Sequence, residues 1–208
     1  MSTRAYLLTA TLSLTALSVG AADVADYAAK IAPLIDPAKL KTLGARAANS
    51  RVQKVTYWLA TARAERVSPS KVAALALKSV GMTNALAAQL TKAAMLRNIT
   101  IAERLGCLDS EGLAEMRKGN AATVRRGPYA GDQLSVDHII PRTVVPELDH
   151  VIANLELMPQ RMNSRKNSSI GARQRDLAAK FREAGLLSDA GLRTVQLAHA
   201  NATLRRIN

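Results

Sequence analysis

A chain of 208 residues, 48% of them hydrophobic, can bury the core of one domain, or of a catalytic module with a helical companion. Aromatic residues make up only 3%, and Ala and Leu supply most of the apolar content, which favours helix over sheet. The net charge of +13, spread along the chain, is typical of a basic soluble protein or of one that binds a phosphate-rich partner. A single cysteine, Cys107, excludes intramolecular disulfides and zinc sites built from cysteine pairs, and we assign it no chemistry.

The N-terminus has the pattern of a secretory signal peptide. Arg4 is followed by a stretch without charge that ends in the small residues Gly20–Ala22, just before Asp23. A short basic start, an apolar stretch and small residues at the exit describe such a signal, with an uncleaved anchor or a helix of the mature protein as alternatives. We therefore expect residues 1–22 to be removed and the protein to be exported, to the periplasm or outside the cell, without stable membrane association.

Residues 23–119 are predicted to form one helix after another. Ser68, followed by a proline, is a start signal, because Ser caps a helix and Pro fits the first helical position, and Gly81 is the matching stop. A second helix is expected from residue 83 to about 105, and a short one from 109 to about 119. Nothing in this region indicates a catalytic site.

From Asn120 onward the sequence predicts strands and loops before helix resumes. Alternating and β-branched residues indicate strands, and clusters of glycine and proline indicate loops. The expected order is a loop at 125–132, a strand at 134–140, a loop at 142–153, a strand at 154–158, and helix from 160 to about 187 with an interruption near Gly171.

The sequence thus predicts a mainly α protein. Its expected parts are a signal peptide at 1–22, a helical region at 23–119, a strand–loop–strand–helix module at 120–187, and a C-terminal helix at 188–208.

Polar residues that can carry a proton or hold a cation gather in the strand–loop–strand–helix module. Asp137 and His138 lie at the end of the first strand, Asn154 opens the second, and Asn163 lies in the first turns of the next helix. A histidine with an ordinary pKa near ~6.5 can be neutral and take a proton from water. Carboxylate and amide oxygens suit a hard divalent cation.

The segments VDHIIP at 136–141, NLEL at 154–157 and NSRK at 163–166, in this order and spacing, resemble the HNH nuclease family. The resemblance implies a ββα-metal hairpin and helix, and an endonuclease that cuts DNA, with RNA as the alternative substrate. It also assigns roles, which are proton abstraction to His138, metal binding to Asp137 and Asn163, and backbone hydrogen bonds that pin the loop to Asn154. Lys166, one turn beyond Asn163, is expected to join the catalytic groups by meeting a phosphate oxygen.

Two departures from the family refine the expected cofactor. Many members brace the fold with two Cys pairs and zinc, which this chain lacks. Asn163 stands where a zinc-using, colicin-like site has His, and an amide oxygen suits a hard cation. We therefore expect one divalent metal, Mg²⁺ first and Mn²⁺ second, with Zn²⁺ disfavoured.

Basic residues flank this constellation. Arg125, Arg126, Arg161 and Arg165 are predicted to form a surface for the phosphates of DNA, without sequence specificity. His150 is an alternative second ligand that we interpret as a loop residue.

His199 lies among alanines on a late helix and is predicted to face solvent.

One other interpretation of the function remains open. The rival function is a basic DNA-binding protein whose HNH module is inactive.

Overall fold

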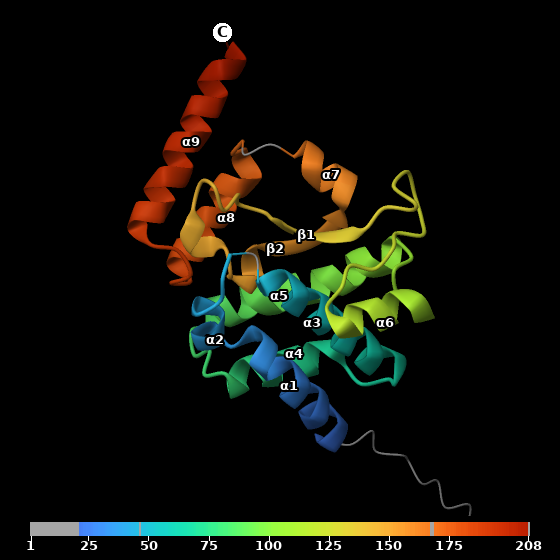
Figure 1. The fold of residues 1–208 in the computed structure, drawn as a ribbon. Coiled ribbons are helices and arrows are strands. Elements are labelled where there is room, and N and C mark those ends of the chain that lie inside the picture. The colour runs from blue at the N-terminus through green and yellow to red at the C-terminus, as the bar shows by residue number, and fades with distance from the viewer. Residues whose placement is uncertain (1–20, 46, 167–168, 208) are drawn as a thin grey trace, which may run out of the picture.

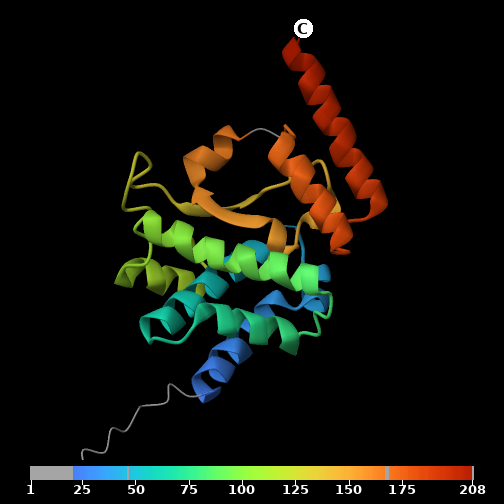
Figure 2. The ribbon, with the colours of Figure 1, turned by 180° about the vertical axis from the view of Figure 1, so that it is seen from behind.

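The computed structural model describes residues 21–45, 47–166 and 169–207, and the predicted mainly α fold is confirmed (Figures 1 and 2). Residues 1–20, which carry most of the predicted signal peptide, lie outside this range. Within it, no helix combines the length and the apolar character needed to cross a membrane.

The N-terminal half forms a layer of helices whose ends follow local capping rules. At Ser68 the predicted cap is confirmed, because its side chain accepts the Lys71 N–H at 3.4 Å. The next helix starts at Ala85, two residues beyond the predicted start at Thr83, because the Asn84 side chain accepts from the free N–H groups of Leu86 and Ala87. The helices are α1 (Ala21–Ile35), α2 (Pro37–Lys41), α3 (Ala48–Ala64), α4 (Pro69–Ser79), α5 (Ala85–Arg104) and α6 (Ser110–Lys118).

Strands β1 (Leu134–His138) and β2 (Leu155–Pro159) pair as an antiparallel sheet, with His138 opposite Leu155. Two short 3₁₀ turns, η1 (Pro146–Leu148) and η2 (Ile152–Asn154), lie in the connection between them. The predicted first strand extends to residue 140, whereas β1 ends two residues earlier. The reason is that the backbone of Ile140 is hydrogen-bonded to the Asn154 side chain instead of to a partner strand.

Helices α3 and α5 cover the edges of this sheet with buried amide side chains. Gln53 Nε2 donates to Leu134 O at 2.6 Å. Asn98 Nδ2 donates to Leu155 O at 3.3 Å, and Asn98 Oδ1 accepts from Leu157 N at 2.9 Å. One apolar cluster continues from Tyr27 in α1 to Leu157 in β2. The helical layer and the strands therefore pack as one unit, with the sheet lying on the helices (Figure 1).

The remaining helices lie on the far side of the sheet, and two of them pack on the β1–β2 connection. They are α7 (Gln160–Arg165), α8 (Ala172–Glu183) and α9 (Asp189–Ile207). A second apolar cluster joins this connection to α8 and α9, through Leu148, Phe181 and Val195 among others. The long connection is thus packed against helices, and α9 extends beyond the rest of the fold (Figures 1 and 2).

Candidate active site

The end of β1, the following loop and α7 enclose a pocket of about 560 Å³. Asp137, His138, Asn163 and Lys166, which the sequence singles out, all line it. Neighbouring residues of a strand point to opposite faces, so Asp137 and His138 both reach this pocket only because β1 ends at His138. The other lining residues are Asn49, Ser135, Val136, Pro141, Arg142, Thr143, Gln160 and Ser164.

Asp137 is a buried carboxylate in contact with a cation. Its residue is only 7% exposed, and its Oδ2 accepts a hydrogen bond from the Lys166 ammonium. The same ammonium also donates to the backbone oxygens of His138, at 2.9 Å, and Ile139, at 3.4 Å. Burial raises the pKa of Asp137 above its ordinary value, and the positive charge of Lys166 opposes that shift. The carboxylate therefore lies in a place where its negative charge needs a cation.

The ring of His138 is oriented by the backbone of Asp149. Nε2 lies 3.0 Å from Asp149 O and 2.8 Å from Asp149 Oδ1. A backbone carbonyl oxygen can only accept, so Nε2 carries the hydrogen when the ring is neutral. Nδ1 is then the nitrogen with the free electron pair, which is the atom that can accept a proton.

Asn154 is fully buried and joins both ends of the β1–β2 connection. Its Oδ1 accepts from Ile140 N at 2.8 Å, and its Nδ2 donates to Ile140 O at 3.0 Å and Leu148 O at 3.5 Å. These are backbone hydrogen bonds of the kind that the resemblance assigns to this residue.

Asn163 presents an amide oxygen on the same pocket as Asp137. Its Nδ2 donates to Ser135 Oγ at 3.2 Å and to Val136 O at 3.4 Å, which leaves Oδ1 as the acceptor of the side chain. One carboxylate and one amide oxygen are hard donors that suit a Mg²⁺ ion, which keeps several waters and takes phosphate oxygens as further ligands. The Lys166 ammonium also contacts Asp137, so a positive charge already lies at this carboxylate. Because both donors are hard oxygens, the set fits Mg²⁺ or Mn²⁺ better than zinc.

The arginines predicted to bind nucleic acid do not line this pocket. Arg125 pairs with Asp109 at 3.2 Å and also with Glu111, both at the start of α6. Arg161 lies 3.5 Å from Asp132 Oδ2. Arg126 and Arg165 are exposed, so they are open to a phosphate partner.

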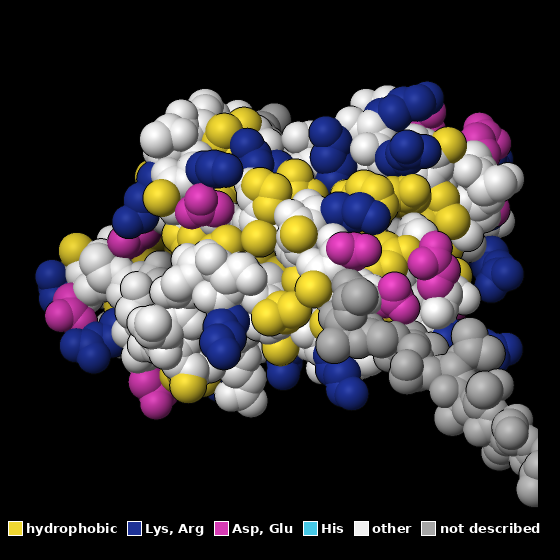
Figure 3. Space-filling model, turned by 90° about the horizontal axis from the view of Figure 1, so that it is seen from below, with side chains coloured by type: hydrophobic (Ala, Val, Ile, Leu, Met, Phe, Trp, Pro, Cys, Tyr) yellow, Lys and Arg dark blue, Asp and Glu magenta, His cyan; other side chains and the backbone are white. Residues whose placement is uncertain are grey.

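The basic side chains are also spread more widely over the molecule than the four arginines predicted to bind DNA. Lys and Arg side chains are scattered over the face of the helical layer that points away from the sheet (Figure 3). Net charge alone therefore does not mark one binding face, and the pocket provides the better guide.

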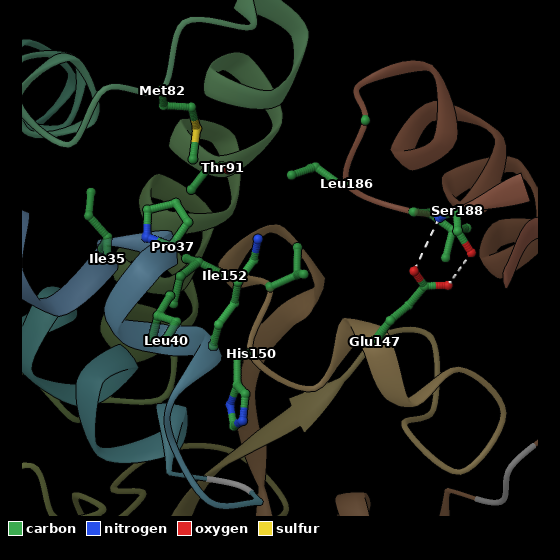
Figure 4. A pocket seen from close by; sticks show the side chains of 14 residues that line it. Ile35, Pro37, Leu40, Met82, Thr91, Glu147, His150, Ile152, Leu186 and Ser188 are labelled. Atoms are coloured by element: carbon green, nitrogen blue, oxygen red, sulfur yellow. Dashed lines mark hydrogen bonds between the residues drawn. The ribbon is translucent and has the colours of Figure 1, made fainter.

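The two other histidines lie away from the pocket. His150 lines a separate, mostly apolar pocket of about 510 Å³, between α1, α2 and the loop before α9 (Figure 4). It does not join Asp137 and Asn163, in agreement with its interpretation as a loop residue. His199 is half-buried, with Nδ1 3.0 Å from Ile170 O, so the prediction that it faces solvent is wrong, because α9 packs on α8 and the segment before it.

Sequence reasoning missed two residues of the site. Arg142 follows the motif directly and lines the pocket, and that adjacency was the available signal. Asp149 lies eleven residues after His138 in the sequence and contacts it only because the loop between them folds back. No sequence pattern indicated this contact.

No profile of a known protein family matches the chain, and comparisons with curated proteins and with solved structures also gave no match. Function is therefore inferred from the residues of the pocket and their resemblance to the HNH pattern.

Proposed function

We propose that this protein is a metal-dependent endonuclease of the HNH type, which hydrolyses phosphodiester bonds of DNA or, alternatively, RNA. The observation that carries the proposal is the meeting of Asp137, His138 and Asn163 in one pocket, with His138 held so that Nδ1 is the basic nitrogen. A base beside two hard oxygen donors is the arrangement that metal-assisted hydrolysis of a phosphodiester needs.

Five of the residues that line the pocket have a role in this proposal. His138 Nδ1 takes a proton from the attacking water, while Asp137 and Asn163 would hold one divalent cation, Mg²⁺ first and Mn²⁺ second. When bound, the cation supplies charge shielding at the scissile phosphate and its leaving oxygen. Lys166 would exchange its contact with Asp137 for a phosphate oxygen. Arg142, which lines the same pocket, is proposed to bind a phosphate of the substrate.

Export of the mature protein is part of the proposal. Helix α1 begins at Ala21, and Val24 is the first described apolar residue that packs against the core. Cleavage just before Asp23 would therefore leave the described apolar contacts of α1 in place. The intact mass of protein from periplasmic or culture fractions tests this, and full-length protein confined to the cytoplasm would contradict it.

A plasmid-nicking assay tests the proposed activity. Wild-type protein should relax supercoiled DNA with Mg²⁺ and stop when a chelator is added. His138→Ala should lower the rate by about 10²- to 10⁴-fold, the usual value of general-base catalysis, while DNA binding persists. Wild-type protein that binds DNA without cutting it would favour the rival function, a basic DNA-binding protein with an inactive HNH module.

A further inference from the structure

We propose that Asp149 is a positioning residue that acts through His138, with its carboxylate stabilising the positive charge that the ring acquires during the reaction. This inference rests on the proposed nuclease function and deepens it.

The carboxylate and the backbone of Asp149 both face the same ring nitrogen. The Nε2–H of His138 donates to the backbone oxygen, at 3.0 Å, a contact that does not depend on the side chain at position 149. Oδ1 lies 2.8 Å from Nε2, within the range of an ion pair once the ring is protonated. The two oxygens therefore have separable roles, since the backbone oxygen orients the ring and the carboxylate stabilises its charge.

Burial makes this charge interaction strong. The side chain of His138 is 11% exposed and that of Asp149 is 12% exposed, so little water lies between or around the two groups. An opposite charge is screened less by a protein interior than by water, so the attraction between this carboxylate and a positive charge on the ring is stronger here than it would be in solvent.

The fold provides a reason for this proximity across the chain. Asp149 follows η1 and donates its N–H to Pro146 O at 3.0 Å. The hydrogen bonds of Asn154 to Ile140 and Leu148 close the connection so that residue 149 returns to the end of β1. On the outer side, Glu147 accepts from Ser188 N at 3.2 Å and Ser188 Oγ at 2.8 Å, which ties η1 to the start of α9 (Figure 4).

The proposed step conserves atoms and charge. The water oxygen forms a bond to phosphorus as the bond from phosphorus to the leaving oxygen breaks. The proton of that water moves to Nδ1 of His138, which becomes an imidazolium beside the Asp149 carboxylate. The leaving oxygen takes a proton from solvent, and His138 later returns its own proton to solvent. The carboxylate of Asp149 is unchanged throughout.

Asp149→Asn is the decisive variant, because it keeps the shape and the backbone oxygen but removes the charge. It should lower kcat by about 10- to 100-fold, as expected for loss of a charge-assisted contact, with KM for DNA unchanged. The same substitution in the His138→Ala protein should leave the residual rate unchanged. A ¹⁵N spectrum of the neutral ring in Asp149→Asn should still show Nε2 protonated, and the melting temperature should confirm a folded protein.

The outcomes separate the two proposals. Wild-type protein that is inactive with Mg²⁺ and Mn²⁺ would overturn the nuclease function, and the role of Asp149 with it. An active wild type with an unchanged Asp149→Asn rate would overturn the role of Asp149 alone. An equal loss with and without His138 would also overturn it, because the effect would then be structural.

Discussion

Asp137 and Glu156 lie directly opposite each other on β1 and β2, and both are buried. The two carboxylates have separate cations, since Lys166 contacts Asp137, whereas Arg173 and Arg97 lie 2.8 Å and 3.6 Å from Glu156. Like charges opposite each other in a sheet are destabilising, so this pair depends on the neighbouring cations. At Asp137 the carboxylate lines the pocket, so the proposed metal ion would add to or replace the ammonium there.

Replacing Asp137 by Asn should therefore lower the cleavage rate without lowering the stability of the fold. Burial raises the pKa of Asp137, which means that its charged form is costly in the fold. Loss of that charge should leave the free energy of unfolding unchanged or raise it by up to ~1 kcal/mol at pH 7, as measured by urea denaturation. Cleavage should fall and recover in part at high Mg²⁺ or Mn²⁺, and Asn163→Ala should behave the same way more mildly. An unchanged metal requirement in Asp137→Asn would contradict its role as a ligand.

Much of the fold follows from local signals in the sequence. The cap at Ser68, the short helix expected from residue 109, and the change from helical to alternating patterns at residue 120 predict elements that the structure contains. The four pocket residues named from the motif also meet, because the turns of one hairpin and its helix set their distances.

Contacts between distant parts of the chain could not be predicted in this way. Gln53 and Asn98 look like ordinary polar helix residues, and their hydrogen bonds to the strands depend on how the helical layer packs. The contact of Asp149 with His138 depends on the folding of a long connection, and the ion pairs of Arg125 depend on where α6 begins. Spacing along the sequence does not encode such distances, since tertiary packing determines them.

Asn154→Ala should destabilise the protein by removing hydrogen bonds within the β1–β2 connection. The Ile140 N–H and C=O, both in a buried residue, would lose their partners. An unsatisfied buried group costs about 1–3 kcal/mol, so the free energy of unfolding should fall by roughly 2–5 kcal/mol. Urea denaturation measures this fall, and Asn120→Ala, at an exposed position just after α6 with a side-chain contact to Glu115, is the control with little effect. Equal stability of Asn154→Ala and wild type would show that the loop does not depend on this side chain.

Arg142→Ala should weaken DNA binding, while Arg125→Ala should have a smaller effect. Both changes remove one positive charge, but Arg142 lines the pocket and Arg125 is paired with Asp109 and Glu111. Loss of one phosphate contact should reduce the slope of log affinity against log salt by ~0.9 on duplex DNA. Fluorescence anisotropy at several salt concentrations, with chelator present to prevent cleavage, measures both slopes. A larger change of this slope for Arg125→Ala than for Arg142→Ala would show that the arginines predicted from the sequence form the binding surface instead.

The buried thiol of Cys107 should make the protein less stable in alkali. Burial raises its pKa from 9.0 to about 11, and the residue has no exposed surface. Between these two values the unfolded chain has lost the thiol proton and the folded chain keeps it, so the free energy of unfolding falls as pH rises. The expected slope approaches ~1.4 kcal/mol per pH unit, and the loss is complete above the folded pKa.

Urea denaturation of wild type and Cys107→Ala from pH 8 to 11 isolates this effect, because the raised pKa of Tyr27, about 12, acts equally in both proteins. Cys107→Ala should be less stable at pH 8, where it leaves a small cavity, and the difference should shrink toward pH 11. Parallel curves over this range would mean that the thiol titrates as it does in the unfolded chain.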